Sequence, residues 1–256
     1  MNGITHHALI TGGSRGIGLG LAARLLARGD RVLVTGRSTR LLAETAEAHP
    51  GLQTFAGDLS NPADREALAA HVRESMPGLD LLVNNAGIQR RVALAEDNAP
   101  WAERQAEIDT LLAAPAHLDH LLIPVLLAHG RPAAIIEVTS GGALIPQPFA
   151  PLYSACKAAL HSYSMTLRHA LAGTPCRVIE LMPPAVATEL AVPDNTHGAP
   201  VDDFCDAALA GIDAALAGGP QVIGYGPTAT DEITQRLQSE QATFDNSTAR
   251  FPVTTY

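Results

Sequence analysis

The feature that most constrains the fold is a regular alternation of two kinds of segment along the chain. Short apolar runs rich in β-branched residues alternate with longer amphipathic stretches, which predicts a parallel sheet with helices on both faces. The apolar runs are nearly continuous, as expected for strands covered on both sides. We therefore expect an α/β fold built on a single doubly wound parallel sheet of about seven strands. The expected strands are 8–12, 31–36, 52–58, 79–85, 133–140, 176–184 and 221–226, and the expected helices are 16–28, 38–48, 62–74, 100–129, 153–172 and 201–217.

One domain accounts for the whole chain. No internal repeat and no low-complexity linker interrupts the series, so we expect a single domain over residues 1–256. The segment 184–200 is punctuated by proline and glycine and follows a strand. It is too long for an ordinary connection, and we expect it to be a loop over the substrate. Residues 228–256 are polar, and we expect them to form a C-terminal tail.

Composition argues against several classes of partner. The chain has 17 Lys and Arg against 26 Asp and Glu, and its net charge of −9 would repel a nucleic-acid backbone. Its three cysteines have no C-x-x-C spacing, so we expect neither disulfides nor zinc, and a reducing compartment. We find no leader-like start and no apolar run approaching the roughly 20 residues of a membrane span. These features predict a cytoplasmic protein that acts on a small molecule.

Three smaller features of the sequence are interpreted without a catalytic or metal-binding role. His117 and His120 have metal-like spacing on an expected helix but lack a third ligand, so we predict no metal site. Cys156 is explained by packing as a small apolar side chain. Arg90 and Arg91 either face an anionic substrate or belong to a solvated loop, and we expect the loop.

A glycine-rich turn follows the first expected strand. In a doubly wound sheet, ligands bind beyond the carboxyl ends of the strands, so this turn is a candidate binding site. Gly12, Gly16 and Gly18 stand in the sequence TGGSRGIG. Glycines at such positions allow a tight turn, a close approach of the backbone to a pyrophosphate, and helix N-terminal amides that face the anion. The turn therefore predicts a dinucleotide cofactor.

The end of the second expected strand indicates which dinucleotide is bound. An NAD site places an acidic residue there, to bind the ribose hydroxyls. This chain has Gly36 at that position and Arg37 after it, with Arg15 in the glycine turn as a second cation. Arginine binds phosphate through a planar fork, so we predict NADP(H). The alternative is that Arg37 is a solvated residue at the start of a helix.

A tyrosine and a lysine four positions apart form the candidate catalytic pair. Tyr153 and Lys157 lie on one face of an expected helix. A phenol with its ordinary pKa of about 10 is a poor acid or base near neutral pH, and a nearby cation lowers that pKa. A shift of two or three units requires about 3 to 4 kcal/mol. Ser140, 13 residues before Tyr153 at a strand end, could bring a second hydroxyl to the same carbonyl oxygen.

Two further motifs end strands at the same sheet edge: NNAG, Asn84 to Gly87, and GDL, Gly57 to Leu59. With TGxxxGxG, Ser140 and YxxxK in this order and spacing, the sequence resembles the short-chain dehydrogenase/reductase family in its compact single-domain branch. The resemblance runs from about Ala8 to Thr188. It implies a Rossmann-like domain and an oxidoreductase that uses NADP(H) to reduce a carbonyl of a small organic substrate, or to oxidise the alcohol.

The resemblance also implies roles for individual residues. Tyr153 would be the general acid in reduction and the general base in oxidation. Ser140 would hold the substrate oxygen, and Lys157 would bind the nicotinamide ribose and lower the pKa of the tyrosine. The implied cofactor contacts are Gly12, Ser14, Arg15, Gly16, Ile17, Gly18, Arg37, Asp58, Leu59, Asn85, Ala86, Gly87, Tyr153, Lys157, Pro183, Val186 and Thr188. Family members commonly pair the helices that correspond to 100–129 and 153–172, so we expect a homodimer or homotetramer.

Two positions depart from the family pattern. Pro184 stands where a glycine is usual, so the local backbone is expected to differ. Leu111 stands where an asparagine usually helps to hold a water that relays protons to the lysine. Leucine cannot form that hydrogen bond, although a backbone carbonyl freed near Pro115 could hold the water instead. The alternative function is a cofactor-binding protein of the same fold with weak or non-redox activity.

Overall fold

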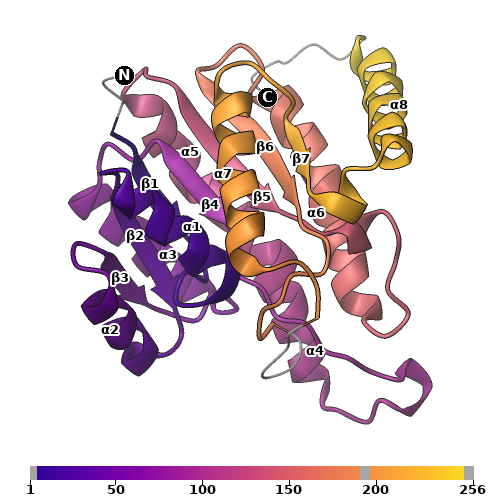
Figure 1. Ribbon diagram of the computed structural model, residues 1–256, viewed down its shortest axis with the longest axis horizontal. Coiled ribbons are helices and arrows are strands. Elements are labelled where there is room, and N and C mark those ends of the chain that lie inside the picture. Colours follow the sequence, from indigo (N-terminus) through magenta and orange to yellow (C-terminus); the bar gives the residue numbers. More distant parts are fainter. Residues whose placement is uncertain (1–4, 191–196, 251–256) are drawn as a thin grey trace.

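The fold is a twisted parallel sheet between two layers of helices (Figure 1). The structure is a computed structural model that describes residues 5–190 and 197–250. Its seven strands follow the order β3-β2-β1-β4-β5-β6-β7, and every pairing is parallel. All seven expected strands and the α/β fold class are confirmed. The strands are β1 (His7–Ile10), β2 (Arg31–Gly36), β3 (Gln53–Ala56), β4 (Leu81–Asn84), β5 (Ala133–Val138), β6 (Cys176–Met182) and β7 (Val222–Gly224).

Alternate side chains of each strand enter different layers. Ile10 and Val34 pack with the layer of α1, α2 and α7, whereas Leu9 and Leu33 pack with the layer of α3, α5 and α6. Figure 1 shows α1 and α7 in front of the sheet. Phe204 of α7 is fully buried, and burial of such a side chain stabilises the fold by about 1.5–3 kcal/mol. The helices are α1 (Gly16–Ala27), α2 (Thr39–Ala48), α3 (Pro62–Ser75), α4 (Trp101–Ile108), α5 (Ala114–Ala128), α6 (Pro151–Ala170), α7 (Val201–Leu216) and α8 (Asp231–Thr248).

The helix expected over 100–129 is continuous but not uniform. A π-helical turn, Asp109–Ala113, joins α4 to α5, and the backbone N–H of Ala114 donates to the carbonyl of Asp109. Pro115 lacks the N–H that an α-helix would direct to the carbonyl of Leu111, which favours a wider turn here. The irregular turn therefore lies next to Pro115, where the sequence suggested a freed backbone carbonyl.

The same helix corrects one expectation from the sequence. By length and composition alone, Trp101–Ala128 is apolar enough to cross a membrane, although no such run was expected. In the fold, Leu118, Leu122 and Leu126 are fully buried in the core beneath the sheet. This position is that of a core helix.

The segment expected as a polar tail instead contains α8. The Thr230 side chain caps it by accepting from the backbone N–H of Ile233 at 3.3 Å. Figure 1 shows α8 at the edge of the molecule. Polar bonds attach it: Arg236 donates to the carbonyl of Leu144 at 3.2 Å, and Arg168 of α6 donates to the side chain of Gln241 at 3.2 Å. No described residue of α8 is buried.

Candidate active site

A cleft of about 1500 Å³ opens at the carboxyl edge of the sheet. It is lined by the segments that follow β1, β2, β3, β4, β5 and β6, and so it spans the point between β1 and β4 where the strand order reverses. Ligands of doubly wound sheets bind at this point. Every site residue predicted from the sequence lines the cleft except Gly18, which lies under the glycine turn.

The glycine turn has a backbone that requires glycine. Gly12 and Gly16 have φ of 65° and 56°, in the region that side chains disfavour. A Cβ at Gly12 would lie 2.8 Å from the Cα of Ala86, and a Cβ at Gly18 would collide with the carbonyl of Gly12. Replacing either glycine would therefore displace the turn that begins α1.

A threonine that sequence reasoning missed joins this turn to the end of β4. The Thr11 hydroxyl accepts from the backbone N–H groups of Asn85 and Ala86, both at 2.9 Å. The Asn85 side chain donates to the carbonyls of Thr11 at 2.8 Å and Gly12 at 3.2 Å. The NNAG motif therefore holds the glycine turn in shape, and the T of TGG was the signal that could have revealed Thr11.

The cleft walls near the glycine turn fit a dinucleotide phosphate. The N-terminus of α1 faces the cleft, and such a terminus binds anions through its free amides. Arg37 is exposed, lines the cleft and has no ion pair among the described residues. At Gly36, a Cβ would lie 3.1 Å from the hydroxyl of Ser14, so little room is left for an acidic side chain.

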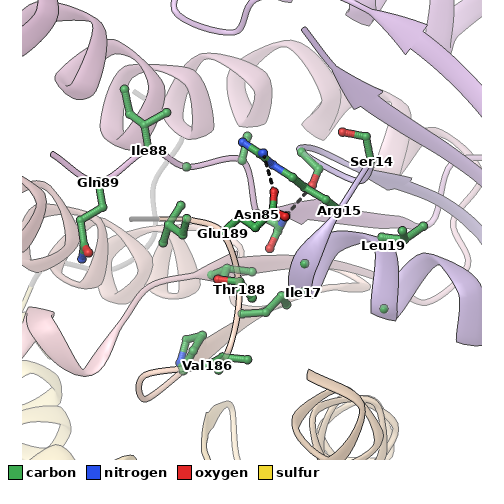
Figure 2. A pocket seen from close by; sticks show the side chains of 18 of the residues that line it. Ser14, Arg15, Ile17, Leu19, Asn85, Ile88, Gln89, Val186, Thr188 and Glu189 are labelled. Carbon is green, nitrogen blue, oxygen red and sulfur yellow. Dashed lines mark hydrogen bonds and ion pairs between the residues drawn. The ribbon is translucent and has the colours of Figure 1, made fainter. Parts of the chain in front are cut away.

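An ion pair crosses the cleft mouth. Figure 2 shows Arg15 of the glycine turn reaching Glu189 of the segment after β6, and the Nη1 to Oε2 distance is 3.1 Å. Arg15, the second cation predicted to bind the cofactor, is therefore paired with a carboxylate of the same chain. Thr188 approaches the glycine turn closely, because a Cβ at Gly16 would lie 3.3 Å from its Cγ2.

The end of β3 supplies the wall at Asp58 and Leu59. The Asp58 carboxylate accepts from the backbone N–H of Ser60 at 3.0 Å and from its hydroxyl at 2.8 Å. These bonds fix the carboxylate where it lines the cleft. The position is compatible with the expected adenine contact, which stays a prediction.

The segment after β6 is ordered by a short parallel bridge. Val186 pairs with Ala199, and Ala187 donates to the carbonyl of Ala199 at 2.9 Å. The carbonyl of Pro183 accepts from the backbone N–H of Gly141 at 2.9 Å, which ties this segment to the end of β5. Residues 191–196 of the expected substrate loop lie outside the described residues.

The three predicted catalytic side chains converge in a buried group. Ser140 follows β5, and Tyr153 and Lys157 lie on the first turns of α6; the three are 7%, 6% and 4% exposed. The Lys157 Nζ lies 5.8 Å from the centroid of the Tyr153 ring. Burial raises the pKa of Tyr153 above its ordinary value, while a hydrogen bond with Ser140 opposes the increase. The expected lowering of this pKa is therefore absent from the protein alone.

Lys157 is held by the backbone of β5. Its Nζ donates to the carbonyl of Val138 at 2.6 Å. Burial lowers the pKa of Lys157 to about 8, although the negative charges of Glu137 and Glu180 partly oppose that change. The Lys157 side chain can therefore change between its ammonium and amine forms close to neutral pH.

A row of buried polar side chains lies on one face of the sheet. Asn84, Glu137 and Glu180 are neighbours in the β4-β5-β6 register, and each is at most 3% exposed. The Asn84 amide donates to Glu137 at 2.7 Å and to Asp119 of α5 at 2.9 Å. Burial raises the pKa of both carboxyl groups, that of Asp119 to about 6. His161 of α6 bonds Glu180 at 2.8 Å and Glu240 of α8 at 3.3 Å.

Leu111 is fully buried and packs against Tyr153. It forms a small cluster with Ala150, Tyr153 and Cys156, so its side chain is apolar packing. The neighbouring Thr110, an alternative to Leu111 at the position of the family's asparagine, lines the cleft. The π-helical turn packs against Tyr153 through Leu111. The carbonyl of Leu111 lacks an α-helical donor because residue 115 is proline.

The fold gives different surroundings to the cysteine, the histidine pair and the two arginines singled out in the sequence. Cys156 is buried, and burial raises its pKa to about 11, which leaves an unreactive thiol. Asp119 points into the core while His120 is exposed, and the described residues contain no group of three metal-binding side chains. Arg90 is engaged in ion pairs, whereas Arg91 lines the cleft.

Comparison with known proteins places these features in a family. The chain matches the model for short chain dehydrogenases over residues 6–198. It is similar to DltE, an uncharacterized oxidoreductase of Bacillus subtilis, at 45% identity over 71% of this chain and 72% of that protein. A short chain dehydrogenase from Burkholderia cenocepacia in complex with NADP has a TM-score of 0.76 at 28% identity, over 98% of both chains. L-sorbose reductase from Gluconobacter frateurii, complexed with NADPH and L-sorbose, has a TM-score of 0.68 at 32% identity, over 73% of this chain and 72% of that chain.

Proposed function

The chain belongs to the short-chain dehydrogenase family, and on that premise we propose that it is an NADP(H)-dependent reductase of a carbonyl group on a small organic substrate. Oxidation of the alcohol is the reverse reaction at the same residues. The observation that carries the proposal is the buried convergence of Ser140, Tyr153 and Lys157 at a cleft that the glycine turn and Arg37 also line. An oxidoreductase that uses a nicotinamide cofactor is what the family implies.

The three side chains have complementary parts in the chemistry. The phenol of Tyr153 is protonated at neutral pH and can donate to a substrate oxygen, although burial raises its pKa and makes it a weaker acid until a cation stabilises the phenolate. Ser140, hydrogen-bonded to that phenol, offers a second hydroxyl to the same oxygen. Lys157 places an ammonium beside the ring, which stabilises the phenolate left after proton donation. When bound, the nicotinamide supplies the hydride.

The choice of NADP(H) is supported by Arg37 and by the absence of an acidic residue at Gly36. A ribose phosphate carries the negative charge that a guanidinium binds through two parallel hydrogen bonds. NAD(H) offers no such group. Two of the similar solved structures contain NADP or NADPH, which is consistent with this choice.

The test is a search for turnover with a built-in control. Absorbance of NADPH is followed while the protein is mixed with a panel of aldehydes, ketones and imines. We expect oxidation of NADPH with at least one carbonyl compound, and Tyr153→Phe should abolish it. Binding of NADPH without turnover of any compound would support the alternative, a cofactor-binding protein with weak or non-redox activity.

We also propose a homodimer or homotetramer formed through α5 and α6. Leu121 and Val125 of α5 remain partly exposed beside the core, as does Tyr163 of α6. Pairing of such surfaces across a two-fold axis would remove them from water. Light scattering at micromolar concentration tests this, because a monomer there would contradict the proposal.

A further inference from the structure

Two adjacent arginines beside the cleft have different surroundings. Arg90 is neutralised: its guanidinium lies 3.3 Å from Asp97 and 3.4 Å from Glu103, and its backbone N–H donates to Glu107 at 3.3 Å. Asp97 also binds Arg104 at 2.9 Å. Arg90 is therefore part of the framework of the segment before α4, and it has no charge to offer a ligand.

Arg91 is directed to the cleft instead. It lines the cleft together with Tyr153, and its guanidinium carbon lies 4.7 Å from the centroid of the Phe149 ring. Stacking on an aromatic face fixes the guanidinium plane and leaves its N–H edge open for a partner. Within residues 5–190 and 197–250, no carboxylate forms an ion pair with Arg91.

Hydrogen bonds within the protein hold the cleft wall around Arg91. The Gln89 side chain donates to that of Gln147 at 3.1 Å, and the Val92 N–H donates to the carbonyl of Phe149 at 3.0 Å. The backbone N–H of Gln147 in turn donates to the hydroxyl of Ser154, next to Tyr153 in the chain, at 2.9 Å. One connected set of hydrogen bonds therefore holds the backbone segments that carry Arg91 and Tyr153.

The carboxylates that line the cleft do not neutralise Arg91. Glu189 pairs with Arg15 at 3.1 Å, and Asp202 pairs with Arg24 at 3.1 Å. Asp58 binds Ser60 at the end of β3, on the other side of the sheet's centre. In a chain of net charge −9, a stacked arginine at the cleft wall remains unpaired among the described residues.

We propose that the substrate is a small carbonyl compound that also carries an anionic group, such as a carboxylate or a sulfonate, and that Arg91 binds this group. Ser140 and Tyr153 bind the carbonyl oxygen, so the two contacts orient the substrate between them. This inference rests on the proposed reductase function. The guanidinium fork matches the two oxygens of a carboxylate, which makes Arg91 a residue that sets specificity.

The experiment compares matched substrates that differ only in charge. NADPH oxidation is measured with a series of straight-chain ω-oxo carboxylates and with their methyl esters. We expect kcat/KM for the best acid to exceed that for its ester by about 10- to 100-fold, the size of a charge-assisted hydrogen bond. The effect should appear in KM, because the anionic group does not change during the reaction.

Variants then assign the preference to one side chain. Arg91→Gln should bring kcat/KM for the acids down to that for the esters, and Arg91→Lys should retain part of the preference. Arg31→Gln is the matched control, because Arg31 is an exposed arginine at the amino end of β2, opposite the cleft. It makes the same change in net charge and should leave the preference intact. NADPH titration of each variant confirms that it is folded.

The outcomes separate the two proposals. Turnover of acids and esters at equal kcat/KM would overturn the role of Arg91 while leaving the reductase in place. A preference for the acids that persists in Arg91→Gln would also overturn it. If no carbonyl compound of either series, nor of the wider panel, oxidises NADPH, the reductase itself is wrong and this inference falls with it.

Discussion

The two ends of the cleft hold their charged groups in opposite ways. Around the glycine turn the charges lie at the surface: Arg15 and Glu189 form an ion pair with side chains 57% and 54% exposed, and Arg37 is exposed as well. Around the catalytic group they are enclosed, with Tyr153 and Lys157 only 6% and 4% exposed. The first end is shaped mainly by backbone, and the second by buried side chains.

Exposure decides what each charge can contribute. A surface ion pair is worth about 0–1 kcal/mol, so Arg15 can exchange Glu189 for a phosphate at little cost. Changes at that end should alter cofactor affinity and should weaken with salt. Buried groups have shifted pKa values, so changes around Lys157 should alter rates and their pH dependence. The difference leads us to expect that affinity for the phosphate end of the dinucleotide and proton transfer depend on separate groups.

The largest effect is expected at the buried end. Tyr153→Phe removes the proposed proton donor, and turnover should fall about 100- to 10,000-fold while NADPH affinity stays nearly unchanged. Tyr225→Phe is the control, since Tyr225 lies outside the cleft and packs its ring 5.7 Å from that of Phe204. Steady-state turnover on the best substrate checks this. A loss below tenfold in Tyr153→Phe would show that another acid does the work.

The next largest effect is expected on cofactor affinity, at the exposed end of the cleft around the glycine turn. Arg37→Asp replaces the cation that we propose binds the ribose phosphate by an acid, so the ratio of NADPH to NADH affinity should fall by about 10- to 100-fold, less at high salt. Arg31→Asp makes the same charge change at an exposed arginine at the amino end of β2, opposite the cleft, and should change the ratio much less. Fluorescence titrations with both cofactors measure it. Equal affinities in the unaltered protein would contradict the role of Arg37.

A smaller effect concerns pH. The folded pKa of Lys157 is lowered to about 8, so its ammonium is present below that pH and lost above it, and reduction should slow as pH rises through about 8. Glu137→Gln removes a negative charge that raises this pKa, so the decline should begin at lower pH, by up to about one unit. Rate profiles of both proteins give the result. An unmoved profile would mean that Glu137 does not act on Lys157.

The smallest effect on rate is expected at Leu111. Leu111→Asn restores the residue type usual in the family, but we expect no gain in turnover because the carbonyl of Leu111 can already hold a water beside the π-helical turn. Stability should fall by about 1–3 kcal/mol, since a polar side chain enters a fully buried cluster. Leu112→Asn, at a half-buried neighbour, is the control. A clear rate gain with a reduced solvent isotope effect would indicate a relay interrupted by the leucine.

Local rules explain how much of the fold the sequence predicts. Seven apolar strands and the glycine turn follow from residue type and spacing, because a strand covered on both faces must be apolar and a positive φ favours glycine. The helix α8 could not be recognised in this way. Its residues Asp231–Thr248 bury no side chain, and polar bonds to α6 hold it, so it has no apolar stripe for periodicity to reveal.

The same contrast applies to the site. Ser140, Tyr153 and Lys157 could be predicted because their spacing follows one strand end and one helix face. The place of Arg91 depends on the pairing of Gln89 with Gln147, 58 residues apart in the chain, and no local pattern contains that contact. The raised pKa of Tyr153 was also hidden, because burial depends on the packing of Leu111 and Ala150 around it.

The claim that the two ends act separately is tested most directly by the dissociation constant of NADPH in four proteins: the parent, Arg37→Asp, Tyr153→Phe and the double variant. Distant, independent sites give additive free energies. We predict that Tyr153→Phe matches the parent and that the double variant matches Arg37→Asp, each within about twofold. A weakening of about tenfold or more in Tyr153→Phe alone, or a double variant far from the product of the two effects, would contradict the account.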